Sequence, residues 1–342
     1  MNPATNRLKA MVKHPFFGFL VLGIVLLLAD VLSVLGVISG SFMSSVILTV
    51  IYAVVGLGFS LLLGFGGLAS LGTAAFVGLG TYLIGYFCGQ LGLPFGLTVL
   101  IAIAAAVVLG AVVGFISLRI EGMYLAIITL GLSEIMREIF KSFTAFTNGV
   151  NGLGFRNFTL FGHPVSDFAV DVIVIVTFVV LILFTINIIK SPTGRALLAM
   201  KNSDSAAQSM GIGLMKYRLL AFVLSTIYAV LGGLLYMMHV KFSIPTTWTL
   251  DFSLNILAAV VVGGAQSITG ILLGTFMIFG LNVSVLANIP FFQQCPNATW
   301  NLSGVLIIVV TMFYPGGLIH LLQSLRIRIA ALLAKRRGKE KP

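Results

Sequence analysis

Long apolar stretches recur along the whole chain and constrain its fold more than any other feature. Of the 342 residues, 59% are hydrophobic and only 8% are charged, which gives a mean hydropathy of +1.13. A helix of about 20 apolar residues spans the hydrocarbon core of a bilayer. The weak alternation that is typical of a membrane β-barrel is absent. The sequence therefore predicts an all-α polytopic membrane protein.

These apolar runs predict about ten membrane-spanning helices. The eighth run is shorter than a normal span, but an even number of crossings is needed to place both basic termini on one side. We expect a single membrane domain over residues 1–342, with a cytoplasmic N-terminus (1–15), a cytoplasmic loop (190–216) and a basic cytoplasmic tail (323–342). The predicted spans are 16–38, 42–63, 67–88, 96–118, 122–143, 169–189, 217–238, 252–264, 268–288 and 302–322.

Most of the 20 Lys and Arg residues fall on one side of the predicted spans. The loop and the tail carry many of them, whereas the other side holds Lys141, Arg156 and Lys241. This asymmetry follows the positive-inside rule and marks the richer side as cytoplasmic. The net charge of +11 therefore indicates contact between the tail and anionic lipid headgroups, not contact with nucleic acid.

Two glycine-rich turns have similar sequences. GFGGLASLG occupies 64–72 and VVGGAQSITG occupies 261–270, and each joins one apolar run to the next. One interpretation is an internal repeat of the kind found in transporters. The other is that small residues let helices pack closely, as the nearby GxxxG spacings also indicate. Under either interpretation, the candidate helix-packing glycines are Gly66, Gly67, Gly263 and Gly264.

Recognisable catalytic and metal-binding motifs are absent from the sequence. Cys88 and Cys295 do not form a CxxC pair, so we expect no metal site. Both cysteines fall near the predicted outer side, where a disulfide is possible; the alternative is two small apolar side chains. We expect no catalytic residue and no cofactor bound by this chain.

The sequence EIMRE places three charges inside a predicted span. Glu134 lies three residues before Arg137 and four before Glu138, so all three share one helix face. Charges inside a membrane are costly unless they face protein or water and pair with one another. The cluster is therefore a candidate for lining a translocation path or gate. The alternative is a structural ion pair near the outer end of the helix.

The loop 190–216 contains the pattern of a short, water-facing helix. Ser203 and Asp204 are suited to cap a helix start, and Gly211 is suited to end the helix. Between them, Ala206, Ala207 and Met210 form a small apolar patch that we expect to dock on another protein. The alternative is a helix that lies among lipid headgroups. We expect the substitution Ala207→Arg to prevent docking.

Four stretches in order resemble the permease subunits of branched-chain amino acid ABC importers of the LivM type. The resemblance covers about residues 45–322. It rests on GLGFSLLLGFGGLASLGTAAFVGLGTYL (56–83), RIEGMYLAIITLGLSEIMREIF with TNGVNGL (119–140 and 147–153), GRALLAMKNSDSAAQSMGIGLMKYRLLAFVLS (194–225), and LNILAAVVVGGAQSITGILLGTF with YPGGLIHLL (254–276 and 314–322).

This resemblance implies a subunit that does not hydrolyse ATP itself. The residues Ser203 to Gly211 would form the coupling helix, which sits in a cleft of an ATPase subunit. The implied partners are a second homologous permease, two ATPases that use ATP and Mg²⁺, a periplasmic substrate-binding protein, an amino-acid substrate and membrane lipid. The implied location is the bacterial inner membrane, with both termini cytoplasmic.

Some residues depart from the family pattern and leave the substrate open. Thr73 stands where many relatives have His, and the outer loop reads TNGVNGL where relatives often have two small residues before the glycines. A permease of the same family for urea or short-chain amides is therefore an alternative. An ion-coupled secondary transporter and an intramembrane enzyme are weaker alternatives, because the Glu134 cluster is the only visible ion-coupling candidate and no catalytic pair is present.

Overall fold

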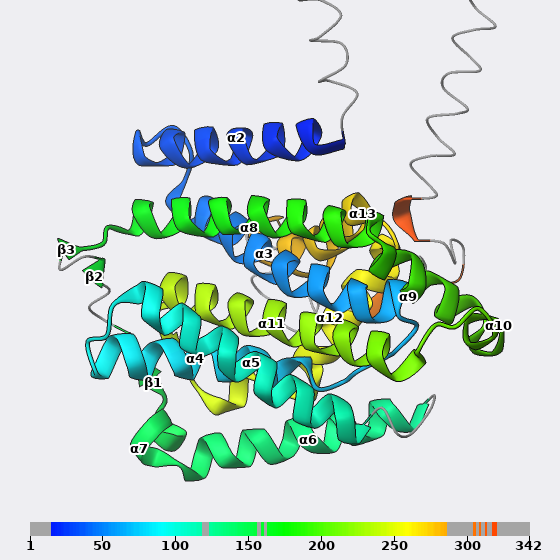
Figure 1. Ribbon diagram of the computed structural model, residues 1–342. Helices are drawn as coiled ribbons and strands as arrows, with labels where there is room; N and C mark the ends of the chain where they lie inside the picture. The colour runs from blue at the N-terminus through cyan, green and yellow to red at the C-terminus, as the bar shows by residue number, and fades with distance from the viewer. Residues whose placement is uncertain are drawn as a thin grey trace, which may run out of the picture.

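The computed structural model describes residues 15–117, 123–155, 159–160 and 163–285, together with a few separate positions between 304 and 319. Helices dominate the described chain (Figure 1). The helices are α2 (Pro15–Val34), α3 (Gly40–Ser60), η1 (Leu61–Phe65), α4 (Thr73–Ile84), η2 (Gly85–Gln90), α5 (Phe95–Ser117), α6 (Met123–Ser142), α7 (Thr144–Thr147), η3 (Gly149–Asn151), α8 (Asp167–Lys190), α9 (Pro192–Asn202), α10 (Asp204–Ser209), α11 (Leu214–Val240), η4 (Pro245–Thr247), α12 (Leu250–Gly263), α13 (Ile268–Thr275) and η5 (Phe276–Val285).

Five helices in the described part of the chain are long and apolar enough to cross a membrane. They are α2, α3 with η1, α5, α8 and α11. Helix α6 carries four charged side chains, and α12 and α13 are shorter apolar helices. The expected number of ten crossings is therefore not confirmed. The tenth expected span, 302–322, falls largely outside the described residues, as does the basic tail.

The third expected span shows why the sequence overestimated helix length. It was expected to begin at residue 67, but α4 begins at Thr73. The π-helical turn η1 ends at Phe65, and Gly67 has a φ of +70°, which a residue with a side chain rarely adopts. The glycine-rich segment therefore forms an irregular turn inside the protein instead of the first turns of a helix.

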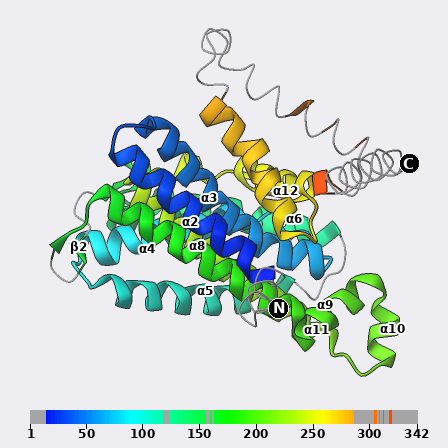
Figure 2. The same cartoon turned by 90° about the horizontal axis from the view of Figure 1, so that it is seen from above.

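The long helices lie side by side in layers (Figures 1 and 2). Helix α2 forms one outer face and packs against α8 and α3. Helix α11 runs through the middle and packs against α3, α4 and α5. Helix α6 forms the opposite outer face in Figure 1 and contacts α4. The bundle thus has a central group, α3, α4 and α11, between two outer helices.

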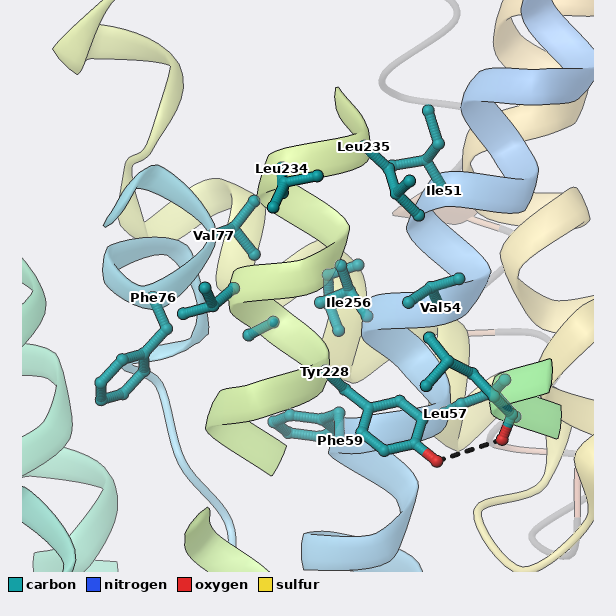
Figure 3. Packing of buried hydrophobic residues seen from close by; sticks show 14 of the residues in the cluster. Ile51, Val54, Leu57, Phe59, Phe76, Val77, Tyr228, Leu234, Leu235 and Ile256 are labelled. Carbon is teal, nitrogen blue, oxygen red and sulfur yellow. Dashed lines mark hydrogen bonds between the residues drawn. The ribbon is translucent and has the colours of Figure 1, made fainter. Parts of the chain in front are cut away.

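The core lies between α3, α11 and their neighbours (Figure 3). Ile51, Val54 and Leu57 from α3 face Tyr228 and Leu235 from α11. The Tyr228 hydroxyl lies 2.7 Å from the Thr185 hydroxyl of α8 and donates to the Leu181 carbonyl oxygen at 3.1 Å. Buried polar groups need such partners, so this contact fixes α8 against the core.

Glycines bring α4 and α11 into close contact. A Cβ atom on Gly233 would lie 1.9 Å from the Val77 carbonyl oxygen, and one on Gly80 would lie 2.1 Å from that of Val230. Neither position accepts a side chain without separating the helices. This is the small-residue packing that membrane helices use, because lipid offers no hydrophobic force between them.

Short strands interrupt the all-helical pattern at the end of the bundle opposite α10. Strand β1 (Leu153–Gly154) pairs antiparallel with β4 (Phe242–Ser243), and β2 (Thr159–Leu160) pairs with β3 (His163–Pro164). The all-α prediction missed these pairs because each strand has two residues. Trp248 is buried beside β4 and donates from Nε1 to the Ser243 hydroxyl at 2.9 Å. The loops at this end are therefore tied to the helices.

Candidate functional site at the α9–α10 end

Helices α9 and α10 project beyond the ends of their neighbours (Figures 1 and 2). Ser191 caps α9 by accepting from the Gly194 amide at 3.4 Å, and Pro192 fills the first helical position. Ser203 caps α10 by accepting from the Ala206 amide at 3.3 Å. Gly211 follows α10 with a φ of +79°. The local form expected for residues 203–211 is present; the docking role of this helix remains a prediction.

The expected apolar patch on α10 is wrong in one residue. Ala207 is only 1% exposed, whereas Met210 is 79% exposed and Ala206 is also exposed. Ala207 and Met210 are three residues apart and would share a face if the helix continued. Helix α10 ends at Ser209, however, and the turn that follows directs the Met210 side chain outward. Ala207 therefore anchors α10 to its own chain. An arginine at this position would disrupt that packing, so Ala207→Arg does not test docking.

Charged side chains fix α10 and α9 to the rest of the protein. Asp204 pairs with Arg218 of α11. The Lys201 ammonium of α9 donates to the Gly64 carbonyl oxygen of η1 at 2.7 Å. The amide of Gln266, in the α12–α13 turn, donates to the same oxygen at 3.2 Å. One carbonyl group therefore connects α9, η1 and the α12–α13 turn.

A cavity of about 840 Å³ opens beside these contacts. Gly66, Gly67, Lys201, Asp204 and Arg218 are among the residues that line it, with Ala126 and Ile127 from the start of α6. Partial burial lowers the pKa of the Lys201 ammonium, because a buried site disfavours the charged form. The same cavity is thus lined by Gly66 and Gly67, which were predicted to pack helices, and by Asp204 of the predicted coupling helix.

The two similar glycine-rich turns contact each other. A Cβ atom on Gly64 would lie 1.9 Å from the Ala265 carbonyl oxygen. Gly263 packs α12 against α13, since its Cβ would lie 2.1 Å from the Gly270 carbonyl oxygen. Gly264, at φ +109°, and Gly67 are turn residues instead of helix-packing residues. Both helices that follow the turns, α4 and α13, continue into π-helices, and the internal repeat remains a prediction.

The Glu134 cluster lies on the outer surface of α6. Arg137 donates from Nε to the Glu134 carboxylate at 2.9 Å and lies 3.5 Å from that of Glu138. Lys141, which the sequence analysis did not include, donates to Glu138 at 2.7 Å. Glu138 is 59% exposed. The pairing along one face is as expected, but the cluster does not line the cavity beside α9 and α10.

Two features of this end escaped the sequence analysis. Helix α9 was not predicted, although Ser191 followed by Pro192 is a recognisable helix start. The contact between Lys201 and Gly64 joins residues 137 positions apart, which spacing along the chain does not reveal.

Cys88 is buried with a free thiol. Cys295 lies outside the described residues, so the possible disulfide remains untested.

Comparison with known proteins agrees with the resemblance. Residues 41–312 match the family of the branched-chain amino acid transport system permease component. The chain is 32% identical over 256 residues to the high-affinity branched-chain amino acid transport system permease protein LivM of Escherichia coli K12, which covers 68% of this chain and 60% of that protein. It is 25% identical to a probable LivM permease of Methanocaldococcus jannaschii, over 64% of this chain and 68% of the relative.

A second kind of subunit also matches. The probable LivH permease of Methanocaldococcus jannaschii is 30% identical over 56% of this chain and 64% of that relative. No solved structure matches the chain. The family match covers well over half of the residues, and it includes α9, α10 and both glycine-rich turns. The chain therefore belongs to the family of branched-chain amino acid transport permeases.

Proposed function

We propose that this chain is the membrane permease subunit of an ATP-binding cassette importer and forms half of a translocation pathway for branched-chain or related hydrophobic amino acids. Family membership supports the transport role. The match spans about 60% of the length of the LivM protein of Escherichia coli, so the substrate and the partners belong to the proposal. The second permease, the two ATPases and the binding protein are separate chains.

The observation that carries the proposal is the way α10 is attached. A six-residue helix is not stable alone, because helix nucleation costs more than so few hydrogen bonds return. Here the cap at Ser203, the burial of Ala207 and the Asp204–Arg218 pair hold it in place. Its outer side, with Ala206 and Met210, remains exposed. We infer that this outer side contacts the ATPase.

The contacts at Gly64 give a route from α10 to the membrane helices. A displacement of α10 acts directly on α11 through the ion pair between Asp204 and Arg218. It also acts through α9 and Lys201 on η1, which continues α3, and on the α12–α13 turn. Because α3 and α11 pack against each other in the core, movement at this end tilts the central helices together. ATP-driven closure of the ATPases would supply that movement.

The Glu134 cluster has a role in this proposal only if a second permease subunit packs against α6. Its charges lie on the exposed side of α6, which also exposes Ile135 and Ile139. Charges in a membrane face protein or water more favourably than lipid. A path-lining role for the cluster therefore requires another permease against α6. Glu134→Ala would then impair uptake or assembly with that permease, while wild-type uptake and yield would make the cluster incidental.

The first test is co-purification from the native host. The full-length chain carries a tag, is extracted gently, and the proteins that accompany it are identified. We expect two ATPases and a second, similar permease. A lone chain that still transports without an ATPase would instead favour an ion-coupled secondary transporter.

The second test compares two exposed positions in proteoliposomes that contain the whole transporter. Met210→Arg adds charge and bulk on the outer side of α10, whereas Leu91→Arg makes the same change at an exposed position directly after η2. We expect Met210→Arg to lower ATP-dependent leucine uptake at least tenfold and Leu91→Arg to leave it unchanged. Wild-type uptake by Met210→Arg would remove α10 from the mechanism. Uptake of acetamide or urea but not leucine would reassign the substrate.

A further inference from the structure

A second cavity lies at the end of the bundle opposite α10. It has a volume of about 370 Å³, within the range of small-molecule sites, and is formed by α2, α3, α8 and α11. Its polar lining includes Asp30 and Ser33 from α2, Ser44 from α3, Asp171 from α8 and His239 from α11. We call it the Asp30 cavity. These polar residues come from four helices.

Asp30 is the unusual member of this group. It is the one charged residue of α2, its side chain is only 3% exposed, and it lines the cavity. Its Oδ2 atom has no hydrogen-bond partner among the residues that the structure describes. An isolated buried carboxylate is strongly unfavourable, and buried polar groups are nearly always hydrogen-bonded. A partner for Oδ2 is therefore expected from outside the described chain.

The nearby cationic groups already have partners. His239 uses Nδ1 to contact the Asp171 carboxylate at 2.8 Å and Nε2 to contact the Ser44 hydroxyl at 2.9 Å. Lys241 pairs with Asp167. Among the described residues, the lining thus holds three aspartates against one lysine and one histidine, so the charge that they contribute is negative whether His239 is neutral or protonated. The cavity therefore favours a cation.

The lining also indicates which kind of cation. No group of three or more His, Cys, Asp or Glu side chains suited to a metal ion occurs among the described residues. The cavity instead combines carboxylate and hydroxyl acceptors with apolar walls from Met43, Phe168 and Met238. An ammonium group has three donors in a tetrahedral arrangement and needs several acceptors. Its carbon chain would contact the apolar walls.

We propose that the Asp30 cavity binds a primary ammonium group, with Asp30 as its main acceptor. Two sources could carry this group: a soluble alkylamine, or the ethanolamine headgroup of a lipid beside helix α2. Both offer the same hydrogen-bonding group. The proposal is independent of the transport function, because it depends only on the lining of this cavity.

The test uses the full-length chain, purified in detergent and washed free of lipid. Binding of n-butylammonium is measured by isothermal titration calorimetry, with tetramethylammonium at the same ionic strength as the comparison. We expect saturable binding of one n-butylammonium per chain and at least tenfold weaker binding of tetramethylammonium, which carries the charge but cannot donate hydrogen bonds. Absence of saturable binding, or equal affinity for the two cations, would overturn the proposal without any variant.

Two matched variants locate the site. Asp30→Asn keeps the shape of the side chain and removes its charge, and we expect it to weaken n-butylammonium binding at least tenfold. Asp251→Asn makes the same change at an exposed position outside the cavity and should retain wild-type affinity. Equal affinities of wild type and Asp30→Asn would contradict the assignment of Asp30.

Lipid nanodiscs then identify the source. The n-butylammonium affinity is measured in discs of phosphatidylethanolamine and in discs of phosphatidylcholine, whose headgroup is a quaternary ammonium. A lower apparent affinity in phosphatidylethanolamine discs would mean that the lipid headgroup competes for the cavity, which supports the proposal with lipid as the source. Equal saturable affinities in both would support it with a soluble amine as the source.

Discussion

Helices α2 and α6 occupy opposite outer faces of the bundle (Figure 1). They differ in where their charged side chains point. Helix α2 is apolar on its surface and turns its one acidic residue, Asp30, inward. Helix α6 turns Glu134, Glu138 and their basic partners outward and buries hydroxyl groups such as Thr129. Charged side chains three residues apart on one helix can pair with each other, so they can lie on its exposed face. A single carboxylate has no such partner on its own helix and needs partners from other helices.

The largest expected difference between the two faces concerns packing. A Cβ atom on Gly23 of α2 would lie 2.6 Å from Val179 Cγ2, whereas one on Gly131 of α6 would meet nothing within 4 Å. We expect Gly23→Leu to lower the free energy of unfolding by about 3 kcal/mol, because overpacking against a stiff valine forces α2 away from α8. Gly131→Leu should change it by under about 0.5 kcal/mol. Unfolding by sodium dodecyl sulfate in mixed micelles measures both, and equal effects would contradict the packing of α2.

The next effect tests the part-buried Asp171–His239 pair beside α2. Asp171→Ala removes the partner of His239 Nδ1, and we expect a loss of about 2 kcal/mol in the free energy of unfolding, because a largely buried polar group is left without its partner. The same change at the exposed Asp251 serves as the control and should have no comparable effect. A loss that is no larger at Asp171 than at Asp251 would show that the pair contributes little.

A smaller effect of opposite sign is expected at Asp30 itself. In amine-free detergent, Asp30→Leu should raise the free energy of unfolding by about 1 kcal/mol, because it replaces a buried carboxylate oxygen that lacks a partner with apolar surface. The same unfolding titration measures it. A clear loss of stability would mean that Asp30 serves the fold of the chain instead of a ligand.

The smallest effect is expected on α6. Glu138→Ala removes an exposed carboxylate from a surface ion-pair network, so the unfolding midpoint of the isolated chain should not change measurably. The informative comparison is with the assembled transporter. A reduced yield of the second permease with this variant would place that subunit against α6, and an unchanged yield would leave the face to lipid or water.

The sequence predicted helix positions well where one apolar run forms one straight helix. The ends of α5 and α8 differ from the expected spans by two residues or fewer. It failed at residues 67–72, which form a turn inside a predicted span. Helix propensity and hydropathy report the average of a segment. They do not report that Gly67 has a φ of +70° or that a Cβ atom there would lie 3.2 Å from Lys201 Cγ of α9.

The charged residues show the same difference between what the local sequence predicts and what helix packing decides. Spacing alone placed Glu134, Arg137 and Glu138 on one face, because i and i+3 or i+4 positions always meet on a helix. It did not reveal that this face is exposed. Along the chain Asp30 stands alone, since Asp171 and His239 lie more than 140 residues away. Only helix packing brings them to one cavity.

The sequence by itself determined the class of protein, the caps of α10 and the family. These depend on apolar content, on residues close together in the chain, and on motifs in a fixed order. Tertiary structure decided which side of α10 is free, where the Gly64 carbonyl receives Lys201 and Gln266, and what Asp30 faces. The physical reason is that these contacts join separate helices, and their geometry depends on how all the helices pack.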